Sequence, residues 1–335
     1  MSVYVIAEAG VNHNGNLETA KRMIAAAKEA GCDCVKFQTF RTELLVTKQA
    51  RKADYQVNNT GNENSQYEML KALELSQNEF EILKDCCLQE GIDFLSSPFD
   101  NESATFLHDL GLSCWKLPSG EITNEPLLRQ IGSYGQRVIL STGMSTLEEV
   151  EAAVEWLREN GSSDITLLHC TSNYPTAPKD VNMRAMLTLQ QHFHLPVGYS
   201  DHTEGIEIPL MAVAMGACVI EKHFTLDRNM PGPDHKASLE PDTLERMVAG
   251  IRSIELAFGS GEKAPTQAEL STRMAARKSI VLSRDVPADR PLTQADILLK
   301  RPGNGLPPSC LHQLLGRSLK QAMPRDTLLR FEDLT

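Results

Sequence analysis

The chain has 335 residues, of which 41% are hydrophobic and 23% charged, and its formal net charge is −11. This length suits one large domain followed by a small one, and the composition is that of an ordinary globular protein with a core that needs no disulfides. The acidic balance, without any run of Lys or Arg, argues against nucleic acid or an anionic membrane as the main partner.

Short apolar runs alternate with longer amphipathic stretches over the first 260 residues. The runs predict strands at 3–10, 33–39, 92–98, 113–121, 137–143, 164–172, 196–203 and 217–225. The stretches predict helices, among them 17–31, 77–91, 146–161 and 240–259. Thr146 and Glu149 fit a capping box at the start of one helix. Regular strand–helix alternation of this kind predicts an α/β fold, a (β/α)8 TIM barrel spanning residues 1–260.

Two parts of the chain depart from this alternation. The segment 40–76 is longer than a normal loop, so we expect an excursion after the second strand that covers the mouth of the barrel. Residues 261–276 are interpreted as a linker with some helical propensity. Residues 277–335 carry short apolar pieces broken by Pro, Asp and Gly, which indicates a small compact domain that leans on another surface.

The N-terminus and the cysteines indicate the cellular compartment of the protein. The first residues lack a basic region and reach Glu8 before a signal-like apolar stretch is complete. No window approaches the roughly 18 apolar residues that a membrane span requires. The eight cysteines are scattered without a CxxC pair, as is typical of reduced core thiols. We therefore expect a cytoplasmic protein.

Polar side chains mark the C-terminal end of every predicted strand, where barrel enzymes build their active sites. They are Glu8, Lys36, Gln38, Ser96, Ser97, Lys116, Ser119, Glu121, Ser141, the stretch from His169 to Tyr174, Asp201, His202, Glu221 and His223. A Lys inside a barrel is unfavourable unless it meets an anion. Lys36 and Lys116, at matching depth on the second and fourth strands, therefore predict a bound phosphate or carboxylate.

Two histidines end neighbouring strands. His202 and His223 could bind one divalent metal and leave positions open for water and a substrate oxygen. Two hydrogen-bonded core or rim histidines fit the spacing equally well. We interpret His169, within an apolar run, and His13, in a loop, as structural residues.

Three carboxylates are candidates for orienting a substrate or moving a proton. They are Glu8, Glu121 and Asp234. Glu8 could instead close the first turn, and Asp234, in a loop rich in Pro and Gly, could serve turn formation. A tight turn after the fourth strand could direct Glu121 into the mouth of the barrel.

The motifs together resemble a known family. In order along the chain they are IAEAGVNHNG, VKFQTF, LSSPFD, WKLPSGEI, ILSTGMS, LLHCTSNYPT, GYSDHT, IEKHFTLD, GPDHKASLEP and KRPGNG. This set resembles the bacterial sialic acid synthases over essentially the whole chain, and the C-terminal piece resembles an antifreeze-like (SAF) domain. The resemblance implies a (β/α)8 barrel and a SAF domain exchanged between the subunits of a homodimer. It also implies condensation of phosphoenolpyruvate with a 2-acetamido sugar, giving a nine-carbon 2-keto acid and phosphate.

The resemblance further implies roles for individual residues. The metal ligands would be His202 and His223, with manganese the usual metal and magnesium or cobalt as alternatives. The positions that hold phosphoenolpyruvate match Lys36, Lys116, Ser119, Ser141 and Tyr174. The positions that face the sugar or the reaction centre match Glu8, Gln38, Glu121 and Asp234. Arg301, in KRPGNG, matches an arginine that reaches the partner subunit's active site.

This chain departs from some members at two positions. Ser97 stands where some carry Thr, which keeps a hydroxyl in the substrate site. Ser172 stands where some carry Asn, so a contact between this position and phosphoenolpyruvate is not implied. Glu121 is our first candidate for orienting the attacking water or moving its proton, and Glu8 is the second.

Several readings of the function compete. The residues of the motifs WKLPSGE and KRPGNG favour an N-acetylneuraminate synthase acting on N-acetylmannosamine. The nearest alternative is an N,N'-diacetyllegionaminate synthase acting on 2,4-diacetamido-2,4,6-trideoxymannose. A metal-dependent aldolase is a further alternative, as is a synthase for a phosphorylated sugar, which would need more basic residues. A non-catalytic carbohydrate-binding or ice-binding protein would leave the polar strand ends unexplained.

Overall fold

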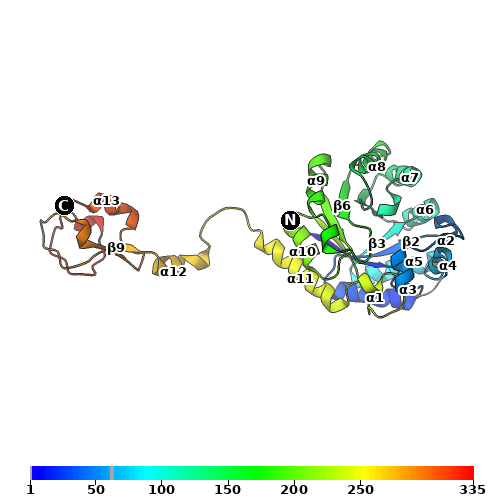
Figure 1. The fold of residues 1–335 in the computed structure, drawn as a ribbon, viewed down its shortest axis with the longest axis horizontal. Coiled ribbons are helices and arrows are strands. Elements are labelled where there is room, and N and C mark those ends of the chain that lie inside the picture. The colour runs from blue at the N-terminus through cyan, green and yellow to red at the C-terminus, as the bar shows by residue number, and fades with distance from the viewer. Residues whose placement is uncertain (1, 61–63) are drawn as a thin grey trace. The chain divides into compact units, whose positions relative to one another are not determined.

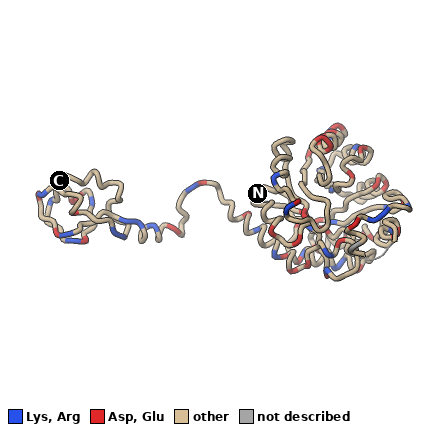
Figure 2. Tube along the Cα trace, viewed as in Figure 1, with Lys and Arg blue, Asp and Glu red and all other residues tan. Residues whose placement is uncertain are grey.

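The computed structural model describes residues 2–60 and 64–335. Contacts divide the chain into two compact units, Met1–Gly259 and Ser260–Thr335. Each unit has a hydrophobic core of its own. Lys and Arg are interspersed with Asp and Glu along both units (Figure 2). In the described part of the chain, no helix combines the length and the apolarity needed to cross a membrane.

The first unit is a parallel barrel. Its strands are β1 (Tyr4–Gly10), β2 (Cys34–Thr39), β3 (Asp93–Pro98), β4 (Cys114–Leu117), β5 (Arg137–Ser141), β6 (Ile165–Cys170), β7 (Val197–Asp201) and β8 (Val219–His223). They pair in the order β3-β2-β1-β8-β7-β6-β5-β4. The strands at the two ends of this order, β3 and β4, also contact each other, so the sheet is nearly closed. The predicted (β/α)8 fold is confirmed.

Helices surround the strands (Figure 1). They are α1 (Leu17–Glu29), α5 (Gln77–Glu90), α6 (Asn101–Asp109), α7 (Glu125–Ser133), α8 (Leu147–Glu159), α9 (Arg184–Phe193), α10 (Glu207–Ala214) and α11 (Pro241–Ala257). The capping box predicted from Thr146 and Glu149 starts α8. The strand predicted over 113–121 was too long. It ends at Leu117 because Pro118 has no N–H for a sheet, and Ser119–Glu121 form a 3-10 turn, η1.

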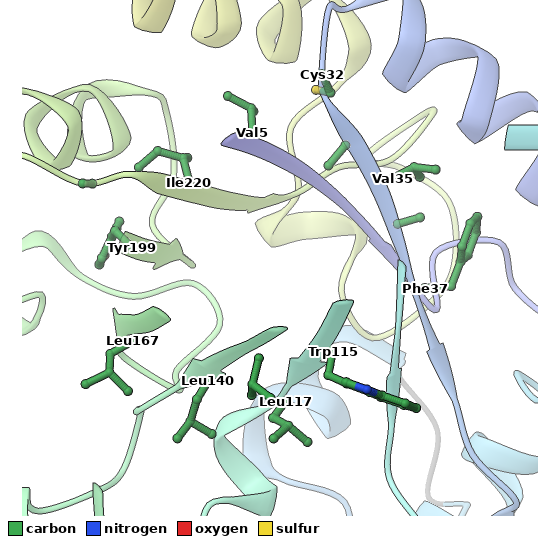
Figure 3. Close-up of a cluster of buried hydrophobic side chains, with 14 of the residues drawn as sticks. Val5, Cys32, Val35, Phe37, Trp115, Leu117, Leu140, Leu167, Tyr199 and Ile220 are labelled. Atoms are coloured by element: carbon green, nitrogen blue, oxygen red, sulfur yellow. The ribbon is translucent and has the colours of Figure 1, made fainter. Parts of the chain in front are cut away.

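Successive side chains of each strand point to opposite faces, and this alternation creates two apolar layers. The outward side chains, among them Val5, Phe37, Trp115, Leu140 and Tyr199, form the core between the strands and the helices (Figure 3). A second cluster fills the interior. We call it the plug, and it consists of Ile6, Cys34, Leu95, Ile139, Leu168 and Val219. Two residues further along these strands, each inward position carries a polar group or a thiol.

The excursion between β2 and α5 contains three short helices, α2 (Thr42–Leu45), α3 (Asp54–Thr60) and α4 (Gln66–Lys71). Its buried residues Phe40, Met69 and Leu73 pack with Val11 of the β1–α1 loop in a small cluster. Residues 61–63 of the predicted excursion lie outside the described residues.

The second unit begins with α12 (Gln267–Ala276), a helix within the segment expected to be a linker. The strands β9 (Ser279–Leu282) and β10 (Ile297–Lys300) form an antiparallel pair. The short helix α13 (Leu311–Leu314) completes the unit, whose core includes Ile280, Leu292, Leu314 and Leu329. The Asp296 carboxylate is fully buried and lies 2.7 Å from both Arg284 Nη2 and Arg290 Nη2.

Candidate active site

One inward side chain from each strand forms a layer directly above the plug. This polar layer consists of Glu8, Lys36, Ser97, Lys116, Ser141, Cys170, Ser200 and Glu221, all of them buried. The layer lines a cavity of about 450 Å³. The cavity therefore lies at the carboxyl ends of the strands, where the βα loops add further side chains.

Two lysines, from β2 and β4 on either side of β3, share one carboxylate. Lys116 Nζ lies 3.3 Å from Glu221 Oε1, and Lys36 Nζ lies 3.6 Å from Glu221 Oε2. Ser200 donates a hydrogen bond of 2.8 Å to Glu221 Oε1. Burial raises the pKa of Glu221, but Lys116 and Lys36 outweigh it and hold the pKa at about 2. Glu221 is thus ionised and favours the charged form of both lysines, although burial lowers the pKa of Lys116.

Glu8 completes the charge balance. Its Oε2 lies 2.6 Å from Lys36 Nζ, and its Oε1 accepts a hydrogen bond from Gln38 Nε2 at 3.1 Å. Burial raises the pKa of Glu8 to about 7, although Lys36 opposes this rise. Glu8 is therefore the carboxylate of this cluster that titrates near neutrality.

Hydroxyl groups surround the two ammonium groups. Lys36 donates to Ser97 Oγ at 3.1 Å, and Lys116 donates to Ser141 Oγ at 2.8 Å. Ser119 Oγ accepts from the Gly143 N–H at 2.9 Å. A Cβ at Gly143 would lie 2.9 Å from Ser119 Oγ and would fill this space. Charged and neutral donors at such spacing suit the oxygens of a phosphate or carboxylate.

His202 and His223 lie beside the polar layer, with ring centroids 5.5 Å apart. His202 donates from Nδ1 to the Thr171 carbonyl at 2.7 Å, which leaves Nε2 unengaged by this bond. Among the described residues, none forms a hydrogen bond with the buried His223 Nδ1. Burial lowers the pKa of both rings and so favours the neutral imidazole, the form that binds metals.

The histidine pair fits a divalent metal only in part. Within residues 2–60 and 64–335, no group of three or more His, Cys, Asp or Glu side chains is arranged to hold an ion. Two imidazoles would leave the remaining positions to water or to substrate oxygens, as in catalytic sites. An orphaned buried nitrogen on His223 supports this reading.

An ion pair behind the histidines fixes the strands that carry them. Asp201 precedes His202 and Lys222 precedes His223, and the two fully buried charges form a salt bridge. Lys222 also donates to the Thr203 carbonyl. Because these side chains point away from the cavity side of β7 and β8, they tie the strand ends together without occupying the site.

Aromatic rings cover the histidine pair. The Tyr174 ring centroid lies 4.1 Å from that of His202 and 5.6 Å from that of His223. Tyr55 of α3 stacks on Tyr174 at 5.0 Å. Asn59 of the same helix donates to the Pro233 carbonyl at 2.6 Å. The excursion thus contacts both the aromatic cover and the loop after β8.

Two further carboxylates line the cavity. Burial alone raises the pKa of Asp234 to about 6. No hydrogen bond to its carboxylate is found in the described part of the chain, and this leaves the group available to a ligand. Glu121, in η1, accepts a hydrogen bond of 2.7 Å from Asn124, and burial raises its pKa.

The site residues predicted within the barrel all line this one cavity. They are Glu8, Lys36, Gln38, Ser97, Lys116, Ser119, Glu121, Ser141, Tyr174, His202, His223 and Asp234. Ser172, of uncertain role, also lines it. Arg301 is exposed and belongs to the second unit, directly after β10. His169 contacts the Val181 carbonyl at 2.7 Å, and His13 accepts a hydrogen bond from the Gly15 N–H.

Three polar residues of the cavity had no individual role predicted from the sequence: Glu221, Ser200 and Tyr55. Glu221 was named only as a polar strand end, although strand alternation places it two residues before His223 on the same face of β8. The same rule applies to Ser200, two residues before His202. Tyr55 lies in the irregular excursion, where no periodic signal marks it.

Comparisons with known proteins identify relatives along the whole chain. An N,N'-diacetyllegionaminic acid synthase of Legionella pneumophila is 48% identical over 338 residues, covering 100% of this chain and 95% of that protein. Its Campylobacter jejuni counterpart is 46% identical over 328 residues, covering 97% and 98%. The structure of an N-acetylneuraminic acid (sialic acid) synthetase from Leptospira borgpetersenii matches with a TM-score of 0.71 and 36% identity, covering 81% of this chain and 90% of that one.

Models of two families match the chain in succession. The NeuB family matches residues 23–263 and the SAF domain matches residues 277–335. These matches confirm the resemblance inferred from the motifs, including the nature of the C-terminal unit. The chain is therefore an enzyme of the NeuB family that carries a C-terminal SAF domain.

Proposed function

We propose that this enzyme condenses phosphoenolpyruvate with 2,4-diacetamido-2,4,6-trideoxymannose, giving N,N'-diacetyllegionaminate and phosphate. The observation that carries this proposal is the end-to-end identity of 48% with an N,N'-diacetyllegionaminic acid synthase. The motifs WKLPSGE and KRPGNG favoured N-acetylmannosamine, whereas the relatives favour the diacetamido sugar. N-acetylneuraminate synthesis is the second candidate, supported by the likeness to the Leptospira synthetase.

Phosphoenolpyruvate would bind at the polar layer. Its phosphate and carboxylate carry the negative charge that Lys36 and Lys116 attract, and Ser97, Ser119 and Ser141 offer hydroxyl donors. In that position the C3 carbon of phosphoenolpyruvate faces the open side of the cavity, because the plug closes the other side.

His202 and His223 would hold a divalent metal, and we propose manganese. Such an ion would polarise the aldehyde of the open-chain sugar. Thr171 orients His202 through its carbonyl, so the Nε2 atom faces away from that bond. Tyr174 covers both rings and limits the access of water to them.

The reaction then requires a carbon–carbon bond, a water and a leaving phosphate. C3 of phosphoenolpyruvate attacks the aldehyde carbon, water adds at C2, and the tetrahedral intermediate expels phosphate. Glu121 is the first candidate to orient this water or take its proton, since burial raises its pKa towards the working range of a base. Glu8, whose pKa burial raises to about 7, is the second candidate. Gln38 and Asp234 would bind the sugar.

Arg301 would act across subunits. We propose that the SAF domain is exchanged in a homodimer and that Arg301 reaches the sugar in the partner's barrel. A non-catalytic carbohydrate-binding protein does not fit an enzyme of the NeuB family. A metal-dependent aldolase remains as an alternative, and it does not account for two lysines gathered around Glu221. The cytoplasmic location stays a prediction.

A phosphate-release assay tests this function. The full chain is incubated with phosphoenolpyruvate, manganese and each of several 2-acetamido sugars, and mass spectrometry identifies the product. Turnover that is fastest with the diacetamido sugar supports the proposal, while preferred turnover of N-acetylmannosamine supports the second candidate. Product formation without phosphoenolpyruvate would favour the aldolase, and sugar binding without any phosphate release would favour a binding protein.

A further inference from the structure

The excursion between β2 and α5 contributes five aliphatic side chains to the lining of the cavity. We call them the apolar wall: Leu45, Val46, Met69, Leu70 and Leu73. Gln56 and Gln66 of the same segment also line the cavity. Met69 and Leu73 are buried in the small cluster beneath, whereas Leu45, Val46 and Leu70 are half-buried. Half-buried aliphatic side chains that line a cavity leave apolar surface for a ligand to cover.

The charged side chains that line the cavity come from outside the excursion. Within the described chain, the only Lys or Arg side chains that line the cavity are Lys36 and Lys116, and both are paired in the polar layer. The other formal charges belong to carboxylates, among them Glu121 and Asp234. A phosphate on the sugar would therefore meet repulsion and no second basic group from the barrel.

The proposed chemistry fixes the position of one end of the sugar. The aldehyde carbon C1 must lie beside the histidine pair and face phosphoenolpyruvate on the polar layer. C6 is the carbon of the open chain furthest from C1, so it points to the open side of the cavity. There the excursion and the loop with Pro233 and Asp234 form the rim. Asp234 offers a carboxylate that can accept hydrogen bonds from sugar hydroxyls. The side chains of the apolar wall offer no hydrogen-bonding group.

We propose that the apolar wall contacts C6 of the acceptor sugar and selects a methyl group there over a hydroxymethyl or phosphorylated one. This inference rests on the proposed function and adds the residues that distinguish the two candidate sugars. A hydroxyl at C6 would lose its water against Leu45, Val46 and Leu70 without gaining a hydrogen bond from their side chains. A methyl group would be buried favourably in the same place.

Two sugars that differ only at C6 test the wall. The full-length enzyme with manganese and phosphoenolpyruvate is assayed with 2-acetamido-2,6-dideoxymannose and with N-acetylmannosamine. We expect kcat/KM to favour the 6-deoxy sugar by at least about 10-fold, the usual range for one apolar group in a pocket. N-acetylmannosamine 6-phosphate should give less product than either.

Neighbouring leucines of α2 provide a matched pair of variants. Leu45 lines the cavity, whereas Leu44 is 48% exposed and does not. Leu45→Asn should reduce the preference for the 6-deoxy sugar by about 5-fold or more. Leu44→Asn should leave it unchanged, and the KM for phosphoenolpyruvate should stay constant in both. Val46→Thr, which keeps the shape and adds a hydroxyl, serves if Leu45→Asn does not fold.

The outcomes distinguish the role of the apolar wall from the synthase activity itself. Equal kcat/KM for the paired sugars in the unmodified enzyme would overturn the role of the wall and leave the synthase activity standing. The same holds if folded Leu45→Asn or Val46→Thr keeps the full preference. Absence of phosphate release with every sugar would overturn the proposed function itself, and the wall with it.

Discussion

The ammonium group of Lys36 lies 2.6 Å from Glu8 Oε2 inside the barrel, where both side chains are almost completely buried. Charges in this position need a partner, because the interior offers little water to solvate them. Glu221 lies within 3.6 Å of the same ammonium group, so Lys36 is held between two carboxylates. An incoming substrate anion would compete with these carboxylates for Lys36.

Lys36→Met should abolish the use of phosphoenolpyruvate while the barrel persists. We expect kcat/KM for phosphoenolpyruvate to fall at least about 100-fold, as for the loss of one charged donor in a water-poor site. Steady-state phosphate release measures the effect, and circular dichroism checks the fold. Lys48→Met removes an exposed lysine of the excursion and should change neither the kcat/KM for phosphoenolpyruvate nor the fold. A defect confined to the KM of the sugar would contradict the assignment of Lys36 to phosphoenolpyruvate.

His223→Ala should weaken metal binding in the absence of any substrate. Loss of one of two imidazole ligands is expected to reduce manganese affinity by at least about 100-fold, more than the loss of a supporting group. Paramagnetic titration of free manganese measures this affinity, and phosphate release should fall with it. His192→Ala changes an exposed histidine on α9 and provides the control. Near-normal turnover of His223→Ala with added manganese would remove the histidine pair from the metal site.

Asp234 should make the free enzyme less stable as the pH rises. Burial raises the pKa of Asp234 to about 6, above the value of about 3.9 for an unfolded chain. The folded state therefore binds this proton more tightly, and its contribution to stability is lost between about pH 4 and pH 6. Asp234→Asn should unfold at higher urea than the unmodified chain at pH 7 and show little difference near pH 4. The opposite order at pH 7 would mean that the carboxylate is stabilised by an interaction beyond those described.

Arg301→Ala should impair sugar binding far more than phosphoenolpyruvate binding. The charge of Arg301 is expected to meet the sugar in the partner's barrel, so the KM of the sugar should rise about 10-fold or more for a lost charged hydrogen bond. Arg325→Ala changes another exposed arginine of the same unit and should have little effect. Equal increases in both KM values would exclude a role specific to the sugar.

Asp296 should stabilise the SAF unit at neutral pH and lose this effect as the pH falls, the reverse of the behaviour expected for Asp234. Arg290, Thr293 and Arg284 hold the pKa of Asp296 well below its usual range, against the effect of burial. This stability is present above about pH 4 and is lost as the pH falls towards the folded-state pKa. Asp296→Asn should lower the unfolding free energy of this unit by about 1 to 3 kcal/mol at pH 7. Hydrogen exchange in the full chain resolves the unit, and the exposed Asp289→Asn is the control.

The sequence predicted the barrel because its signals are local. Alternating apolar strands and amphipathic helices follow from the periods of the two structures, and Thr146 with Glu149 marks a helix start directly. The polar strand ends, such as Lys36 and Lys116, were recognised because barrels gather those ends at one face. Pro118 should have shortened the fourth strand in the prediction, since the signal was visible in the chain.

The remaining features depend on distances across the barrel. Nothing in the spacing of Lys36, Lys116 and Glu221 along the chain reveals that one carboxylate lies between two lysines from β2 and β4. The stacking of Tyr55 on Tyr174 joins an irregular segment to the loop after β6, and no periodic pattern encodes it. The motifs also did not identify the sugar, because they describe the polar layer, whereas every residue of the proposed apolar wall lies outside them.

The plug imposes an order of events on the reaction. Ile6, Cys34, Leu95, Ile139, Leu168 and Val219 close the barrel below the polar layer. Everything that reaches the lysines must therefore arrive from the mouth, and everything made there must leave by the same way. The reactant that binds deepest has to enter first, because the second reactant would block its path. Binding would therefore be ordered, and the products would leave through the same opening.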